Sequence, residues 1–325
     1  MATYKGIQGY SVQKLSDDPT PTANYVGQLW YNSGSGKFKI ATAGAGVWAA
    51  GGNVNTSNSY RVGAINATQT AGLIFGGHPT LAATEEYSGT AWSSVNDLNS
   101  GRAGPAGAGT QTAGLCSAGT PYSPNSNAKT VDCESYDGTS WSGENDCLTG
   151  VSWMTGFGTQ TAAMIAGGTT GNGVFIDNSQ TWNGTSWCEG NDLLVATEGN
   201  AGTGTTTAGL SGGGLAPGAV LTCQTYDGNS WTEVNNMNSL HVYGGCFGTQ
   251  TSALLCGSNL PSPATGATET FDGTSWTETT DFTTARFGMG AMGTAASGLI
   301  ASGAATNATE EWTNPVYAIK TVTVS

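Results

Sequence analysis

Residues 109–113 read Gly-Thr-Gln-Thr-Ala, and residues 136–141 of the same stretch read Tyr-Asp-Gly-Thr-Ser-Trp. These two elements, joined by an apolar run that ends in small residues, recur along almost the whole chain. The first element opens at Ala67, Gly109, Gly158, Gly204, Gly248 and Gly293, so the spacings are 42, 49, 46, 44 and 45 residues. A nearly constant period in this range predicts copies of one supersecondary unit packed side by side.

Each copy carries two aromatic residues five positions apart. The first members are Tyr87, Tyr136, Trp182, Tyr226, Phe271 and Trp312, and the second members are Trp92, Trp141, Trp187, Trp231, Trp276 and, in the last copy, Tyr317. In four of the copies Asp-Gly or Asn-Gly lies between the two aromatics. This pair forms tight hairpin turns because it adopts left-handed backbone angles at low cost. One copy therefore predicts four short antiparallel strands, and no stretch of the repeat has a helical period.

Four antiparallel strands with one aromatic pair per copy are typical of a propeller blade. The sequence thus predicts an all-β fold, a β-propeller of six four-stranded blades over residues 55–325, with residues 1–54 as a small N-terminal β extension. The five repeated tryptophans Trp92, Trp141, Trp187, Trp231 and Trp276 are expected at equivalent places between blades. The alternative is a seven-bladed ring in which the extension forms the seventh blade.

The repeat resembles the Kelch and galactose-oxidase-like propeller repeat. The similarity rests on the apolar run ending in Gly-Gly, the aromatic-Asp-Gly turn and the tryptophan that follows. This resemblance implies a ring with a loop-lined binding face. It implies no particular activity, because propellers of this kind have many unrelated roles.

The N-terminal extension contains a hairpin sequence of its own. Residues 27–40 read Gly-Gln-Leu-Trp-Tyr-Asn-Ser-Gly-Ser-Gly-Lys-Phe-Lys-Ile. This Gly-x-Leu-Trp-Tyr-Asn hairpin is similar to hairpins of bacteriophage tail-fibre and other virion proteins, and residues 1–10 are similar to proteins of phages of aquatic cyanobacteria. An isolated hairpin buries too little surface to be stable, so we expect its aromatic and apolar side chains to form an anchor, namely Leu29, Trp30, Tyr31 and Phe38. Trp48, followed by a stretch that resembles the residues after Trp92, could instead donate a strand to the ring.

Composition excludes several classes of partner. The 325 residues carry a formal net charge of −13 with only nine lysines and arginines, and nucleic-acid binders need clustered positive charge. We find no run of 18 apolar residues and no signal-peptide pattern, so we expect neither membrane insertion nor Sec export. Of the seven cysteines, Cys116, Cys133, Cys223 and Cys256 occupy expected strand positions, which predicts buried, unpaired thiols rather than disulfides or a zinc site.

The residues that could perform catalysis follow the repeat. His78 and His241 lie in different copies and have no partner motif, and Arg61, Arg102 and Arg286 open the first strand of three copies. A repeated arginine is expected to clamp a turn or a carboxylate between blades. Asp137, Asp227 and Asp272 occupy one turn type in separate copies, whereas glycoside hydrolysis needs two convergent carboxylates. We therefore expect no catalytic, cofactor-binding or metal-binding residue.

The copies differ most after the second strand, and candidate binding residues there are Tyr122, Asn125, Asn172 and Asn259. The leading interpretation is a non-enzymatic bacteriophage virion structural protein, such as a tail fibre, decoration or host-adsorption component. Its expected partners are other virion proteins through the N-terminal extension and host-surface glycans, with homo-oligomers also considered; its expected location is the virion, assembled in the host cytoplasm. The alternatives are a Kelch-type protein interaction module and, more weakly, a carbohydrate-active enzyme.

Overall fold

The computed structural model describes residues 12–20, 25–121, 128–171, 173–304, 306–314 and 316–323. The chain divides into two compact units. Residues 47–313 form the larger unit, and residues 1–46 together with residues 314–325 form the smaller one. All regular elements of the described residues are strands, 30 in number. They form seven four-stranded sheets and one two-stranded sheet, and six of the four-stranded sheets lie in the larger unit.

The first three sheets of the larger unit each follow the chain order. We call them blades 1, 2 and 3. Blade 1 contains β5 (Val62–Gly63), β6 (Leu73–Phe75), β7 (Thr84–Tyr87) and β8 (Trp92–Ser94). Blade 2 contains β10 (Ala106–Thr110), β11 (Ala113–Ser117), β13 (Cys133–Tyr136) and β14 (Trp141–Glu144). Blade 3 contains β15 (Thr155–Thr159), β16 (Ala162–Ala166), β17 (Ser179–Trp182) and β18 (Trp187–Glu189).

The remaining blades repeat this plan, except that the last one takes a strand from the other end of the chain. Blade 4 contains β19 (Ala201–Thr205), β20 (Ala208–Gly212), β21 (Cys223–Tyr226) and β22 (Trp231–Val234). Blade 5 contains β23 (Gly245–Thr249), β24 (Ser252–Ser258), β25 (Thr265–Phe271) and β26 (Trp276–Glu278). Blade 6 contains β27 (Gly290–Thr294), β28 (Ser297–Ala301), β29 (Thr309–Thr313) and β4 (Val47–Ala50). The two-stranded sheet pairs β9 (Arg102–Ala103) with β12 (Thr120–Pro121).

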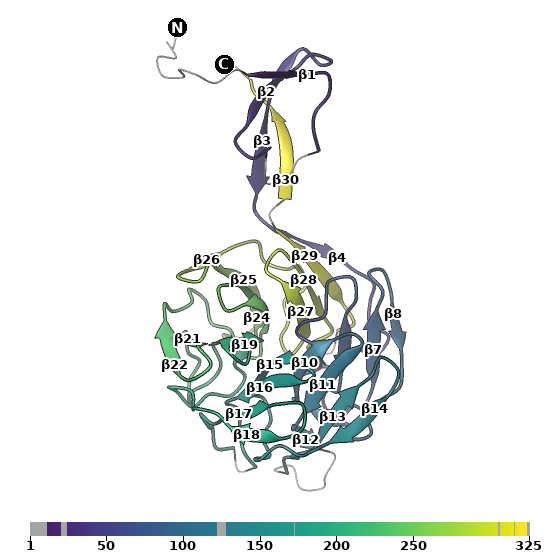
Figure 1. Cartoon of the computed structure of the whole chain (residues 1–325), viewed down its shortest axis with the longest axis vertical. Helices are drawn as coiled ribbons and strands as arrows, with labels where there is room; N and C mark the ends of the chain where they lie inside the picture. The colour runs from purple at the N-terminus through teal and green to yellow at the C-terminus, as the bar shows by residue number, and fades with distance from the viewer. Residues whose placement is uncertain are drawn as a thin grey trace. The chain divides into compact units, whose positions relative to one another are not determined.

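The six sheets close into a ring. The first strand of each blade contacts the first strand of the next in the order β5, β10, β15, β19, β23, β27 and back to β5. Figure 1 shows β8, β14, β18, β22 and β26 at the rim of this unit, with β10, β15, β19 and β27 towards its centre. The larger unit is therefore an all-β propeller of six four-stranded blades, as the repeat predicts, and the extension does not form a seventh blade.

The ring is closed by β4, which the extension contributes to blade 6. Trp48 lies opposite Trp312 in the β4–β29 pairing, at the place that the second aromatic takes in the other blades. The predicted pairing of Trp312 with Tyr317 is wrong, because Tyr317 belongs to β30 and lies opposite Ala43. The boundary expected at residues 54/55 is likewise corrected: the chain enters the ring at Val47 and leaves it after Thr313.

The turn between the third and fourth strands follows from its sequence. In blade 2, Asp137 Oδ1 accepts hydrogen bonds from the backbone N–H groups of Thr139 and Ser140, both at 2.8 Å. Gly138 adopts a φ of +89°, in the left-handed region that glycine tolerates. Asn183, Asp227 and Asp272 form the same turn in blades 3, 4 and 5. The turn thereby places the two aromatic residues of a pair opposite each other on neighbouring strands.

The aromatic pairs form much of the core. Trp92, Trp141, Trp187, Trp231 and Trp276 are 5–6% exposed, and each ring lies 4.9–5.5 Å from its cross-strand partner. Trp141 also crosses to the neighbouring blade, where its indole N–H donates to Thr84 Oγ1 at 3.0 Å and its ring packs on Phe75. Since truncation of a buried aromatic typically costs about 3–5 kcal/mol, these contacts contribute strongly to the packing of the blades.

The smaller unit is a four-stranded sheet in the order β1 (Gln13–Leu15), β2 (Leu29–Asn32), β3 (Lys37–Gly44) and β30 (Val316–Thr321). β1 runs parallel to β2, and the other pairs are antiparallel. The hairpin expected from residues 27–40 is present as β2 and β3, and both of its edges are covered by further strands. Within the described part of the chain, no helix has the length and apolar character needed to span a membrane.

Candidate binding face at the channel mouth

The repeated arginines form ion pairs inside individual blades. Arg61 pairs with Glu85 at 2.5 Å and Arg286 with Glu310 at 2.7 Å, and Arg102 pairs with Glu134. All of these side chains are at least nine-tenths buried. Each pair lies within one blade, rather than between blades as the sequence predicts. The glutamate also accepts backbone N–H groups from the connection that enters its blade, as Glu310 does from Thr283 and Thr284.

The two histidines have separate surroundings. His241 is buried in blade 5 between the carbonyl oxygen of Gly257 and the carboxylate of Glu269, at 3.1 and 3.4 Å. His78 is exposed. Among the residues that the structure describes, no group of three or more His, Cys, Asp or Glu side chains could hold a metal ion.

One rim of the ring departs from the sixfold repeat in a regular way. The connections that enter the six blades each contain a residue with a left-handed backbone, φ between +54° and +67°; these residues are Tyr60, Gly104, Trp153, Gly199, Tyr243 and Gly288. Five backbone hydrogen bonds of 2.6–3.0 Å link them around the channel, from Tyr60 to Gly288, Gly288 to Tyr243, Tyr243 to Gly199, Gly199 to Trp153, and Trp153 to Gly104. The positions therefore form one circle, in which aromatic residues and glycines alternate.

The alternation has a packing reason. A Cβ atom on Gly104 would overlap the indole of Trp153, and one on Gly199 or Gly288 would come within 2.8 Å of the ring of Tyr243 or Tyr60. Each glycine thus leaves the space that an aromatic ring fills. We call Tyr60, Trp153 and Tyr243 the aromatic triad.

The aromatic triad packs edge to face over the channel. The ring centroids of Tyr60 and Trp153 are 4.5 Å apart, those of Tyr60 and Tyr243 are 5.3 Å apart, and those of Trp153 and Tyr243 are 5.9 Å apart. All three residues are half-buried, so they present ring surface at the mouth of the channel beside a small pocket of about 100 Å³.

Polar groups accompany the aromatic triad. The hydroxyl of Tyr243 donates to Glu198 Oε1 at 2.9 Å, and burial together with the charge of Glu198 raises the pKa of Tyr243. Burial likewise raises the pKa of Tyr60, with Glu198 as the second cause. The two phenols therefore remain neutral at physiological pH, and that of Tyr243 uses its O–H on Glu198.

The variable loops lie at this same rim. In blade 2, Ala106 at the start of β10 pairs with Ser117 at the end of β11, so the loop after the second strand emerges beside the connection that carries Gly104. Asn259 follows β24 in blade 5, and its backbone N–H donates to the carbonyl of Val242, the neighbour of Tyr243. Its side-chain Oδ1 is buried without a hydrogen-bond partner. The other candidate loop residues, Tyr122, Asn125 and Asn172, lie outside the described residues.

The candidate anchor residues differ in exposure. Trp30 is buried, and its indole N–H donates to Asp18 Oδ1 at 3.1 Å, while Leu29 and Phe38 are 39% and 47% exposed. Tyr31 packs edge-on against Phe38 with centroids 5.2 Å apart. The sequence reasoning missed Asp18, which also accepts a 2.6 Å hydrogen bond from Asn32; these bonds, led by that of Asn32, lower the pKa of Asp18.

The sequence reasoning also missed the aromatic triad. Its members lie in the irregular connections between copies, outside the aligned strands, and they alternate with glycines, so an alignment of all six copies shows no consistent residue there. The signal that was available is the position itself: an aromatic shortly before the first strand in copies one, three and five, and a glycine in copies two, four and six.

The ring and its mouth define the chain as a β-propeller protein. The solved structure of YjhT matches it with a TM-score of 0.66 and 14% sequence identity, over 82% of this chain and 99% of that one. This similarity is one of fold. No model of a protein family matches the sequence, and no curated protein matches it.

Proposed function

We propose that this protein is a non-enzymatic structural component of a bacteriophage virion that displays its propeller as a binding face. In this proposal the smaller unit joins other virion proteins and the channel mouth contacts the host surface. The resemblance of residues 27–40 to virion hairpins supports the setting. The exposed Leu29 and Phe38, on a compact unit outside the ring, support an attachment role, because exposed apolar side chains on one small sheet favour docking.

The observation that carries the binding role is the aromatic triad. The structural residues of this ring repeat with the blades, whereas Tyr60, Trp153 and Tyr243 interrupt the sixfold pattern at one rim. Binding sites combine apolar ring surface with a few oriented polar groups, and the triad carries two neutral phenols of its own with Glu198 beside them. Host-surface glycans fit this chemistry, since sugars offer both hydroxyl groups and apolar C–H faces.

Mass spectrometry of washed virions tests the setting. We expect the intact chain in the particles, and its absence would remove the virion role. A second virion preparation, from phage encoding a chain truncated to residues 46–313, tests the anchor. We expect the ring unit to be missing from those particles, because the sheet of β1, β2, β3 and β30 is removed as a whole.

Adsorption of the purified full chain to host cells tests the binding face. Trp153→Gly copies the residue that blades 2, 4 and 6 carry at this position, so the backbone tolerates it while the indole is lost. We expect cell binding to fall at least tenfold, while Leu148→Ala, a change of an exposed residue on the same connection, leaves it unchanged. Equal binding by both variants would remove the triad from the binding face.

A Kelch-type interaction module that binds a protein is the second candidate, because an aromatic mouth also suits a peptide loop. Enzymatic removal of host glycans separates the two. Binding that survives deglycosylation but is lost after protease treatment of the cells favours the protein partner.

A further inference from the structure

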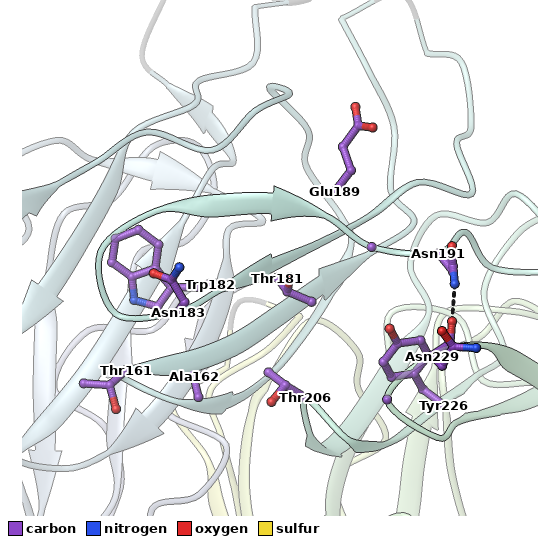
Figure 2. A pocket seen from close by; sticks show the side chains of 12 residues that line it. Thr161, Ala162, Thr181, Trp182, Asn183, Glu189, Asn191, Thr206, Tyr226 and Asn229 are labelled. Atoms are coloured by element: carbon purple, nitrogen blue, oxygen red, sulfur yellow. Dashed lines mark hydrogen bonds between the residues drawn. The ribbon is translucent and has the colours of Figure 1, made fainter.

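A second place where the repeat is interrupted lies on the other rim of the ring. We call the interface between two neighbouring blades a seam. The seam between blades 3 and 4 contains a pocket of about 580 Å³. Figure 2 shows Thr181 and Thr206 in its middle, with Trp182 and Asn183 on one side and Tyr226 on the other. We call this space the seam pocket. Its lining includes hairpin turns at the ends of the blades opposite the aromatic triad, together with strand residues and the segment that follows β18. It shares no residue with the pocket beside the triad, so the two sites are separate.

At this rim, a glutamine side chain bridges the two blades of most seams. The glutamine of the Gly-Thr-Gln-Thr element reaches from the first turn of one blade to two carbonyl oxygens of the preceding blade. Gln111 donates to Gly72 and Tyr87, with distances of 3.1 and 2.8 Å. The equivalent bonds are made by Gln69, Gln160 and Gln250. In blade 4 the position is taken by Thr206, whose side chain is too short to make this bridge.

A second substitution enlarges the same seam. At the seams before blades 1 and 2, the tyrosine hydroxyl of one blade donates to a glutamate of its neighbour: Tyr87 to Glu311 at 2.6 Å and Tyr136 to Glu86 at 2.9 Å. In blade 3 the glutamate position is occupied by Thr181. The hydroxyl of Tyr226 therefore has no carboxylate partner.

The seam between blades 5 and 6 provides a contrast. It also lacks the glutamine, since Ala295 takes that position. There the larger Trp312 donates its indole N–H to the carbonyl oxygen of Ala295 at 2.9 Å and packs on Trp48 at 5.2 Å. The seam pocket therefore combines the short side chains of Thr181 and Thr206 with Tyr226 in place of the tryptophan that fills the seam between blades 5 and 6.

The lining defines the chemistry of a ligand. Threonine and tyrosine hydroxyls and the amide of Asn183 both donate and accept hydrogen bonds. The only ionisable carboxylate in the lining is Glu189, and the lining contains no lysine or arginine, so an anionic ligand would be repelled. Trp182 and Tyr226 are 3% and 4% exposed, so their rings form the base of the pocket while Thr181, Asn183 and Thr206 reach its opening. The volume is in the range of small-molecule sites.

We propose that the seam pocket binds a neutral sugar, as a monosaccharide or one unit of an uncharged oligosaccharide. The inference rests on the proposed adsorption function for its ligand class, and it adds a second glycan contact on the rim away from the aromatic triad. The hydroxyls of Thr181, Thr206 and Tyr226 would exchange hydrogen bonds with the sugar hydroxyls.

The test uses the full chain with a panel of probes: methyl glycosides of glucose, galactose, mannose and N-acetylglucosamine, and N-acetylneuraminic acid as the charged comparison. Binding is measured by saturation-transfer NMR and calorimetry. Thr206→Gln restores the residue of the filled seams and occupies the pocket, and Ala295→Gln makes the matched change at the seam before blade 6.

We expect at least one neutral glycoside to bind, with affinity at least tenfold weaker in Thr206→Gln and unchanged in Ala295→Gln. Thr181→Glu, which gives Tyr226 its carboxylate, is the second variant and is expected to weaken binding likewise. Binding of no neutral glycoside, a preference for N-acetylneuraminic acid, or full affinity in both blade 3 and blade 4 variants would overturn the inference. Virion incorporation and the effect of Trp153→Gly are measured separately, so failure here with those results intact concerns the seam pocket alone.

Discussion

In blades 2 and 3, a side-chain oxygen accepts hydrogen bonds from the backbone of the connection that enters the blade. The side chain is charged in blade 2 and neutral in blade 3. In blade 2 the carboxylate of Glu134 accepts the backbone N–H groups of Asn99 and Ser100. In blade 3 the amide oxygen of Gln180 accepts the N–H of Leu148 at 2.7 Å. Blade 2 also has Arg102 against its glutamate, whereas blade 3 has no arginine there. Between these two blades, the glutamate is present where an arginine accompanies it. Blade 4 resembles blade 3, since the amide oxygen of Gln224 accepts the N–H of Leu194.

The comparison shows that capping the connection is the shared requirement and that the ion pair is an addition to it. An acceptor oxygen is needed in every blade, because buried backbone N–H groups must be hydrogen-bonded. A buried carboxylate without a partner would be costly. The predictions below change the charge in one blade towards that of the other.

The largest effect is expected from Arg102→Met. This change removes the base and leaves Glu134 buried and unpaired, so the free energy of unfolding should fall by about 3–5 kcal/mol. Urea denaturation at neutral pH measures it, with Lys129→Met in the same blade as the control. A loss below about 1 kcal/mol would mean that the carboxylate does not depend on its arginine.

Gln180→Glu makes the opposite change in blade 3 and introduces a buried carboxylate without a base. We expect a loss of roughly 1–3 kcal/mol at pH 7. Burial raises the pKa of such a carboxyl, so the loss should shrink as the pH falls and the group takes up a proton. Thermal melts from pH 7 to pH 4 test the trend against the exposed change Asn236→Asp; a penalty independent of pH would contradict it.

The double variant Arg102→Met with Glu134→Gln gives blade 2 the composition of blade 3. We expect its stability to return to within about 1.5 kcal/mol of the natural chain, since a buried ion pair replaced by neutral groups of similar volume is often close to neutral. The double-mutant cycle yields the coupling free energy. Additive losses from the two changes would show that the residues act independently.

Acid should have a weaker effect, which we test at the ion pair of blade 6. For Glu310, burial raises the pKa, but the hydrogen bonds from Arg286, Thr283 and Thr284 outweigh it, so the net pKa is lowered from 4.5. Its stabilisation is therefore present above the pKa of the unfolded chain and is lost as the pH falls through the lower folded value. Between pH 5 and pH 2, we expect Glu310→Gln to lose stability less steeply than the natural chain. Identical slopes would assign the acid response to other groups.

The smallest effect involves the cysteines and leaves stability unchanged. Blade 2 buries Cys133, whose pKa is raised to about 11, mainly by burial, while Cys188 in blade 3 is exposed. The other five cysteines are buried, and none is in a disulfide. A thiol reagent should label one group rapidly in the native protein and seven after denaturation without reductant. Labelling that persists in Cys188→Ser would show that a buried site opens.

The sequence predicts the ring well because the blade contacts are periodic. Trp141, for example, donates to Thr84 of the preceding blade, and the period of the sequence places an equivalent tryptophan in blades 1 to 5. The closure of blade 6 could be predicted only as an alternative. Tyr317 has the correct spacing after Trp312, whereas Trp48 lies far away in the sequence, and local spacing does not reveal which of the two supplies the strand.

The candidate sites were less predictable because they lie where the copies differ. The aromatic triad lies in connections that share no sequence motif, and its geometry depends on the left-handed backbone of Tyr60, Trp153 and Tyr243, which no local pattern announces. The seam pocket exists because Thr181 and Thr206 are shorter than the glutamate and glutamine at the equivalent positions of other blades. An absence becomes visible only when the bonds made by Gln111 and Glu86 in other blades are known.

The composite blade 6 also determines where a pulling force would act. The two chain segments that join the smaller unit to the ring enter it at Val47 and Thr313, which are paired with each other across β4 and β29. A load applied through the smaller unit therefore reaches the ring through two hydrogen-bonded strands at once and from the same end. Such a load draws the strands in one direction instead of peeling β4 from β29. The joint that closes the ring is thus also a mechanical coupling, and the β4–β29 pair would be shielded from tension that a single connecting chain would concentrate on one strand.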